Sequence, residues 1–275
     1  VKLAWKTKLG TRLTSPVVAA GKVFLADIDS HKLLALDAAT GQVCWTYTAG
    51  GRIDSPPTYY KGRLLFGCAD GRVYCLDASD GELVWRFAAA PDDLRMTSFE
   101  QVESVWPVHG SVLVENGMVY CVAGRSMFLD GGLRFLRLDP MTGQKISEKI
   151  LDDRDPNSGE NLQIHVKRLN MPVALPDILS SDGQYVYMHS QRFDLQGNRL
   201  AIPPYSGDHN EQGRQQYGVG MHLFSPTGFL DGSYMHRTYW VFGRSWASGA
   251  GGYHRAGAYA PAGRMMVFDE NRIFG

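Results

Sequence analysis

Short runs of alternating apolar and polar residues, separated by glycine-containing turns, fill the first part of the chain. One set of four runs is PVVAA (16–20), KVFLADI (22–28), KLLALD (32–37) and QVCWTY (42–47). Similar runs follow, including RVYCLD (72–77) and ELVWRF (82–87). A period of two predicts β-strands, and strands this apolar fit sheets that are packed on both faces.

The set of four runs repeats every 40 residues. Trp5, Trp45 and Trp85 have this spacing, and Asp37 and Gly41 return as Asp77 and Gly81. Weaker copies cover 110–151, 174–202 and 222–243, and another begins at 259. Four-stranded units of about 40 residues are typical of a β-propeller. The sequence therefore predicts an all-β propeller with five blades and a partial sixth within residues 1–275.

The turn that recurs in each copy has a structural interpretation. Asp37 and Thr40 are suited to hydrogen bonds with backbone amides, and Gly41 allows a positive φ before the outer strand. Trp45 then offers a large flat surface to the adjacent blade. The predicted structural docking residues are Trp5, Asp37, Gly41, Trp45, Asp77, Gly81 and Trp85.

The segments ALDAATGQVCW (35–45) and CLDASDGELVW (75–85) resemble the tryptophan-docking motif of the pyrroloquinoline-quinone-like (PQQ-like) β-propeller repeat family. The resemblance is strong over 1–90, fair to about 150, and continues as a rhythm to 275. The family includes quinoprotein dehydrogenases and bacterial outer-membrane assembly lipoproteins that bind no quinone. The resemblance implies a propeller domain and a periplasmic or cell-envelope location.

Composition narrows the choice of partners. Lys plus Arg and Asp plus Glu both number 28, so no bulk charge favours nucleic acid or a membrane surface. The chain has no run of 18 apolar residues, so the sequence does not predict direct insertion into a membrane. Because the chain starts at Val1 and stops within an expected strand, we expect an excerpt of a longer protein whose closed ring has seven or eight blades.

Four long connections join the predicted blades, and long loops on a β-scaffold often carry function. They are residues 88–110, 152–172, 203–221 and 243–263. Within the second, DRDPNSGE (153–160) has acidic residues at alternate positions, as a calcium loop does. Its glycine falls one place late and Ile164 stands where an acidic residue should close the site, so we expect a solvated turn and no metal.

Polar and aromatic residues near the predicted channel mouth are candidates for ligand binding. They are Trp106, His109, Arg125, Asp130, Asp177, His222, His236, Arg237 and Trp240. Serines that start innermost strands, such as Ser15 and Ser55, could join them, although bonding a backbone group is the favoured interpretation. No catalytic residue is predicted.

Three functions remain open at this point. The favoured one is a non-catalytic binding or scaffold module for a protein, a polar small molecule or a glycan, without a cofactor. The second is a quinone-dependent dehydrogenase domain with PQQ and calcium, although the chain lacks the adjacent cysteine pair that several such enzymes carry. The third is a carbohydrate-active propeller. The oligomeric state is left open.

Overall fold

The structure is a computed structural model. It describes residues 2–10, 12–165, 174, 176, 179–188, 191–201, 221–224, 238–242, 262–263, 267–269 and 272–274. The chain divides into two compact units, Val1–Arg125 with Leu136–Ser147 and Ser126–Phe135 with Glu148–Gly275. Each unit is described by itself.

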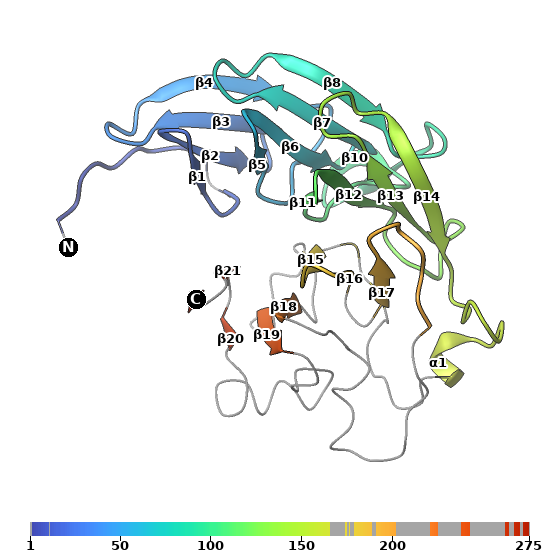
Figure 1. The fold of residues 1–275 in the computed structure, drawn as a ribbon. Coiled ribbons are helices and arrows are strands. Elements are labelled where there is room, and N and C mark those ends of the chain that lie inside the picture. The colour runs from blue at the N-terminus through green and yellow to red at the C-terminus, as the bar shows by residue number, and fades with distance from the viewer. Residues whose placement is uncertain are drawn as a thin grey trace. The chain divides into compact units, whose positions relative to one another are not determined.

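Two complete four-stranded antiparallel sheets form most of the first unit (Figure 1). The first has β1 (Val17–Ala19), β2 (Lys22–Asp27), β3 (Lys32–Asp37) and β4 (Val43–Thr48). The second has β5 (Thr58–Tyr60), β6 (Arg63–Cys68), β7 (Arg72–Asp77) and β8 (Leu83–Ala88). Both sheets follow chain order and carry the same register shift, at Ala35/Leu36 and at Cys75/Leu76. The repeat seen in the sequence is therefore a repeat of structure.

A third sheet has the same order. Its strands are β11 (Leu113–Glu115), β12 (Met118–Ala123), β13 (Leu133–Leu138) and β14 (Lys145–Leu151), and the division between the units runs through it. Middle strands are buried over most of their length, as Leu64–Cys68 in β6 shows. Burial on both faces is expected when sheets stack as blades, and the predicted all-β propeller class is confirmed.

Three tryptophans each pack on an aspartate turn and form a hydrogen bond with it. In each case the indole covers a glycine of positive φ and its Nε1–H donates to a carbonyl oxygen beside the aspartate. Trp5 covers Gly41 and donates to Ala38 at 2.9 Å, Trp45 covers Gly81 and donates to Ala78 at 3.3 Å, and Trp85 covers Gly143 and donates to Pro140 at 3.0 Å. A side chain at these glycines would occupy the space of the indole ring, and the backbone there has a positive φ. Both the packing and the backbone conformation therefore require glycine.

In the second unit the described strands are shorter. β15 (Leu179–Ser181), β16 (Tyr185–Met188) and β17 (Gln191–Asp194) form one sheet. β18 (Met221–Phe224), β19 (Thr238–Phe242) and β20 (Ala262–Gly263) form another, and β21 (Val267–Phe268) pairs with β22 (Ile273–Phe274). The helix α1 (Leu162–His165) has four residues. In the described part of the chain, no helix is long and apolar enough to cross a membrane.

The acidic segment 153–160 is a further copy of the aspartate turn. The Oδ1 atom of Asp155 accepts hydrogen bonds from the amides of Asn157 and Ser158, and the amide of Gly159 donates to the Asp155 carbonyl. The same bonds hold the turns at Asp37 and Asp139. Among the residues that the structure describes, no group of three or more His, Cys, Asp and Glu could hold a metal ion.

Candidate functional site

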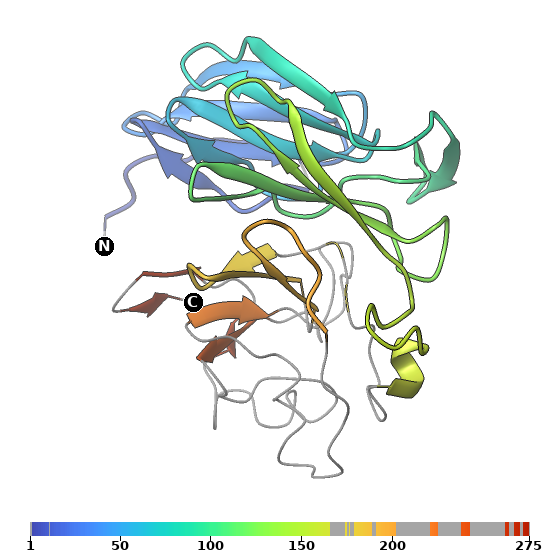
Figure 2. The same cartoon turned by 45° about the vertical axis from the view of Figure 1, so that its right-hand side comes forward.

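The first long connection, predicted as a loop at 88–110, contains a β-hairpin. Strand β9 (Arg95–Ser98) pairs with β10 (Gln101–Ser104). Backbone bonds tie the hairpin to the second sheet, because the Ser104 amide donates to the Ala69 carbonyl at 2.8 Å. A side-chain bond of 2.6 Å between His31 Nε2 and Gln101 Oε1 ties it to the first sheet. Figure 2 shows this hairpin in green at the right, beside the ends of the sheets.

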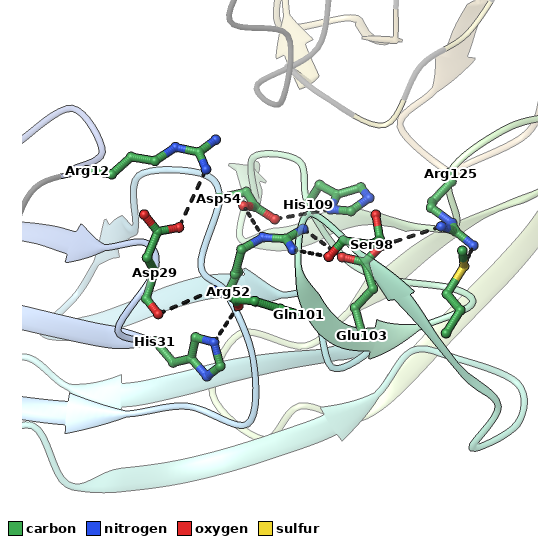
Figure 3. A network of polar contacts seen from close by, with 11 residues as sticks. Arg12, Asp29, His31, Arg52, Asp54, Ser98, Gln101, Glu103, His109 and Arg125 are labelled. Carbon is green, nitrogen blue, oxygen red and sulfur yellow. Dashed lines mark hydrogen bonds and ion pairs between the residues drawn. The ribbon is translucent and has the colours of Figure 1, made fainter.

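Arg52 is the centre of a buried network beneath the hairpin (Figure 3). Its side chain is 1% exposed. Nε donates to Asp54 Oδ1 at 3.1 Å, Nη2 donates to Glu103 Oε2 at 2.6 Å, and Nη1 donates to the Ser98 carbonyl at 3.2 Å. One guanidinium thus joins the connection after β4 to both strands of the hairpin, and each of its three nitrogens donates a hydrogen bond.

Asp54 also holds His109. Its Oδ2 lies 3.2 Å from His109 Nδ1, and both side chains are buried. Burial by itself would raise the pKa of Asp54, but the hydrogen bond from His109 and the charge of Arg52 outweigh it and lower that pKa. Because a carboxylate only accepts, His109 carries its proton on Nδ1. No other described residue bonds to Nε2, so this atom can accept a hydrogen bond from a ligand.

Glu103 has a second cation beside it. Arg125 Nη1 lies 3.5 Å from Glu103 Oε1, an oxygen that is buried and accepts no hydrogen bond. The Arg125 side chain is 24% exposed, whereas that of Glu103 is 1% exposed. Two guanidinium groups thus face two carboxylates, and these four groups carry no net charge. Arg125 therefore connects a buried ion pair to the surface.

The tip of the hairpin is strained and exposed. Phe99 and Glu100 have φ values of 48° and 62°, in the left-handed region that costs other residues than glycine roughly 1–2 kcal/mol each. The Arg52 guanidinium lies 5.0 Å from the centroid of the Phe99 ring. Phe99 nevertheless remains 51% exposed, and Val102 in β10 is 60% exposed. Contacts below the tip hold this conformation while apolar surface faces outward.

The structure brings together two of the predicted ligand residues, His109 and Arg125. Trp106 is half-buried against the hydrophobic cluster of the second and third sheets. Asp130 is exposed in the loop between β12 and β13. For His222 in β18 and Trp240 in β19 only the strand pairing is described, and Asp177, His236 and Arg237 lie outside the described residues.

Sequence reasoning missed Arg52, Asp54 and Glu103. The available signal was GGRIDSPP (50–57), which sets an arginine and an aspartate directly before the Ser-Pro that starts an inner strand. Ser55 itself donates to the Gly110 carbonyl at 2.9 Å, so its hydroxyl bonds a backbone group of the next connection. This is the interpretation that was favoured for such serines.

Comparisons with known proteins agree with this architecture. The family model described as "Outer membrane protein assembly factor BamB" matches residues 2–191. The curated proteins contain no match. Quinohemoprotein alcohol dehydrogenase ADHIIG from Pseudomonas putida HK5 is 17% identical over 83% of this chain and 38% of its own, with a TM-score of 0.54. The quinohemoprotein alcohol dehydrogenase from Comamonas testosteroni is 17% identical over 83% and 39%, with a TM-score of 0.50.

At such identities the two dehydrogenases show a shared fold and nothing about activity. This chain spans just under two fifths of their length. The family model, in contrast, covers more than half of this chain and includes all three aspartate turns that receive a tryptophan. The chain therefore belongs to the PQQ-like β-propeller repeat family, whose matching model is that of the outer membrane protein assembly factor BamB.

Proposed function

We propose that this chain is a non-catalytic binding module that contacts a protein partner through the hairpin β9–β10. One observation carries the proposal: the hairpin is fixed from below by buried Arg52 and presents Phe99 and Val102 to solvent. An aromatic residue on a preorganised support loses little entropy on binding, and such residues are frequent hot spots. The strained tip supports the same role, since strain is often retained where it positions a functional group.

The family supports a protein partner over a small substrate, because the matching model is described as an assembly factor. A periplasmic or cell-envelope location belongs to the same proposal. His109 Nε2 and the exposed part of Arg125 could add polar contacts to the partner beside the hairpin. These two groups could also bind a polar small molecule in place of a protein, and this would still be a non-catalytic binding function.

A quinone-dependent dehydrogenase is the second candidate, favoured by the folds of the two solved structures. PQQ enzymes hold calcium with acidic oxygens. The buried carboxylates of the described network, Asp54 and Glu103, are instead held by Arg52, and each has a second basic neighbour. Calcium would have to displace these cations, so the described residues do not fit such a site.

Site-specific photocrosslinking in cells tests the binding proposal. A photoreactive phenylalanine analogue replaces Phe99 or Val102 in the full-length protein, and Leu83 in β8 serves as the control because it is also exposed and apolar. We expect one discrete protein adduct from the two hairpin positions and none from Leu83. The proposal fails if the hairpin positions give no adduct, or if Leu83 gives the same one.

A binding assay separates the second candidate. PQQ and Ca²⁺ are added to the full-length protein, and quinone absorbance and dye reduction are followed. We expect neither stoichiometric uptake nor turnover. Stoichiometric quinone binding with dye reduction would replace the scaffold proposal with the dehydrogenase.

A further inference from the structure

A pocket of about 260 Å³ opens between the first and second sheets. It lies at the other end of strands β2 and β6 from the Arg52 network, where the hairpin turns at 20–21 and 61–62 meet the turn after β7. Sites for drug-sized ligands begin at about 300 Å³, so this pocket suits a smaller molecule.

The lining of the pocket carries a surplus of positive charge. Lys22, Lys61 and Arg63 contribute three cations, and Asp77 contributes the one carboxylate. That carboxylate is already occupied, because Oδ2 pairs with Arg63 Nη1 and Oδ1 accepts from the amide and hydroxyl of Ser79. Asp77 therefore offers little attraction to a cation and little repulsion to an anion.

Some hydrogen-bond donors of the residues that line the pocket have no partner among the described residues. The Nε atom of Arg63 is buried and has no hydrogen-bond partner. Neither lysine forms a direct ion pair among the described residues, although Lys22 lies across the sheet from Asp37 and its charge helps to lower the pKa of that carboxyl. The Lys61 ammonium lies 5.1 Å from the centroid of the Tyr60 ring, and its backbone holds a φ of 44° at the lip of the pocket.

The equivalent junction of the next sheet pair serves as an internal comparison. The hairpins Lys61–Gly62 and Asn116–Gly117 occupy the same place between the first two strands of their sheets. Asn116 there replaces Lys61, and Met118 replaces Arg63. The repeat therefore folds without cations at the positions of Lys61 and Arg63, whereas the position of Lys22 is taken there by Arg63 itself. The presence of Lys61 and Arg63 at the first junction calls for another explanation.

We infer that this pocket binds a small anion that carries a phosphate monoester group. Such a group has a charge of about −1.5 to −2 and three acceptor oxygens, which match the surplus of two positive charges and the ammonium groups of the two lysines. A single carboxylate would neutralise only one of them. The group can belong to a soluble metabolite or to a phospholipid head group. The site is independent of the hairpin and of the proposed partner.

Titration with inorganic phosphate tests the site in the full-length protein. The amide resonances of Gly62 and Ser79 are followed at constant ionic strength. We expect a saturable shift, and Lys61→Asn should weaken binding about tenfold because a charge-assisted contact is lost. This variant copies Asn116 of the equivalent turn and is compatible with the positive φ, so it should fold.

Lys32→Asn is the matched control, since Lys32 is exposed at the other end of β3's hairpin with β2. A shift that does not saturate, or equal losses in both lysine variants, would overturn the inference. Co-sedimentation with vesicles of phosphatidylcholine and phosphatidic acid, whose head group is a phosphate monoester, then identifies the source. Vesicle binding lost in Lys61→Asn assigns a lipid head group, and phosphate binding without vesicle binding assigns a soluble monoester.

Discussion

Replacing Arg52 by methionine should destabilise the hairpin strongly, and by an amount that depends on pH. Methionine retains much of the aliphatic volume but leaves Asp54 and Glu103 buried without their shared cation. Removing one partner of a buried ion pair typically costs about 3–5 kcal/mol. The lost contact with the Phe99 ring adds about 0.5–2 kcal/mol. The loss is large against a total stability of about 5–15 kcal/mol.

The pH dependence follows from the carboxylates. In the native protein the pKa of Asp54 is lowered. The carboxylate therefore contributes to the free energy of unfolding at pH values above its unfolded-state pKa, and this contribution is lost as the pH falls through the lowered value. Without the charge of Arg52, burial acts more strongly on the pKa of Asp54 and raises it, so this carboxylate takes up a proton on mild acidification. The variant should therefore be most destabilised near pH 7.5 and closer to the wild type near pH 5.

Hydrogen exchange of the Glu103 and Ser104 amides measures the effect locally, and urea unfolding followed by tryptophan fluorescence measures it globally. Arg12→Met is the control, because Arg12 pairs with Asp29 at 3.5 Å with both side chains more than 40% exposed. Such a surface pair contributes about 0–1 kcal/mol. A loss below about 1 kcal/mol for Arg52→Met, or an equal loss at both pH values, would refute the argument.

Two further predictions concern the packing of the sheets. Gly81→Ala should cost about 1–3 kcal/mol more than Gly62→Ala, because both glycines have a φ near 80° but only the Cβ at Gly81 would meet the Trp45 ring, at 2.6 Å. Denaturant midpoints of the two variants check this, and equal midpoints would contradict the docking geometry. Native protein should expose one reactive thiol to Ellman's reagent, that of Cys44, and four after denaturation. Burial raises the pKa of the Cys75 and Cys121 thiols to about 12, and it also raises the pKa of the Cys68 thiol. Rapid reaction of a second thiol in the native protein would refute this burial.

Some of the site was visible in the sequence and some was not. His109 and Arg125 were selected because polar groups near a channel mouth are candidates for ligands. The structure shows that both have buried acidic partners and belong to one charge network, while their role in ligand binding stays a prediction. Residues 88–110 were predicted as a long connection, and the hairpin within it turns at Phe99 and Glu100, whose side chains disfavour a positive φ. Tertiary contacts of Arg52 and His31 supply the stabilisation that the turn residues lack.

The turn at 153–160 shows the opposite case. Its residues do form a local motif, but the calcium-like spacing of its acidic residues hid the aspartate turn. In the structure Asp155 bonds the backbone and side chain of its own turn, as Asp37 and Asp139 do. A search for the aspartate and the glycine four residues later, without the tryptophan, would have found it.

The sequence by itself determined the fold class and the family, because strand period, aspartate turn and tryptophan spacing are local patterns that repeat every 40 residues. Only the tertiary structure decided the site. Arg52 meets Glu103 across 51 residues and Asp54 meets His109 across 55, and no local pattern records such separations. The physical reason is that burying a charge is favourable only beside its partners, and those partners come from different connections between sheets and from an inserted hairpin.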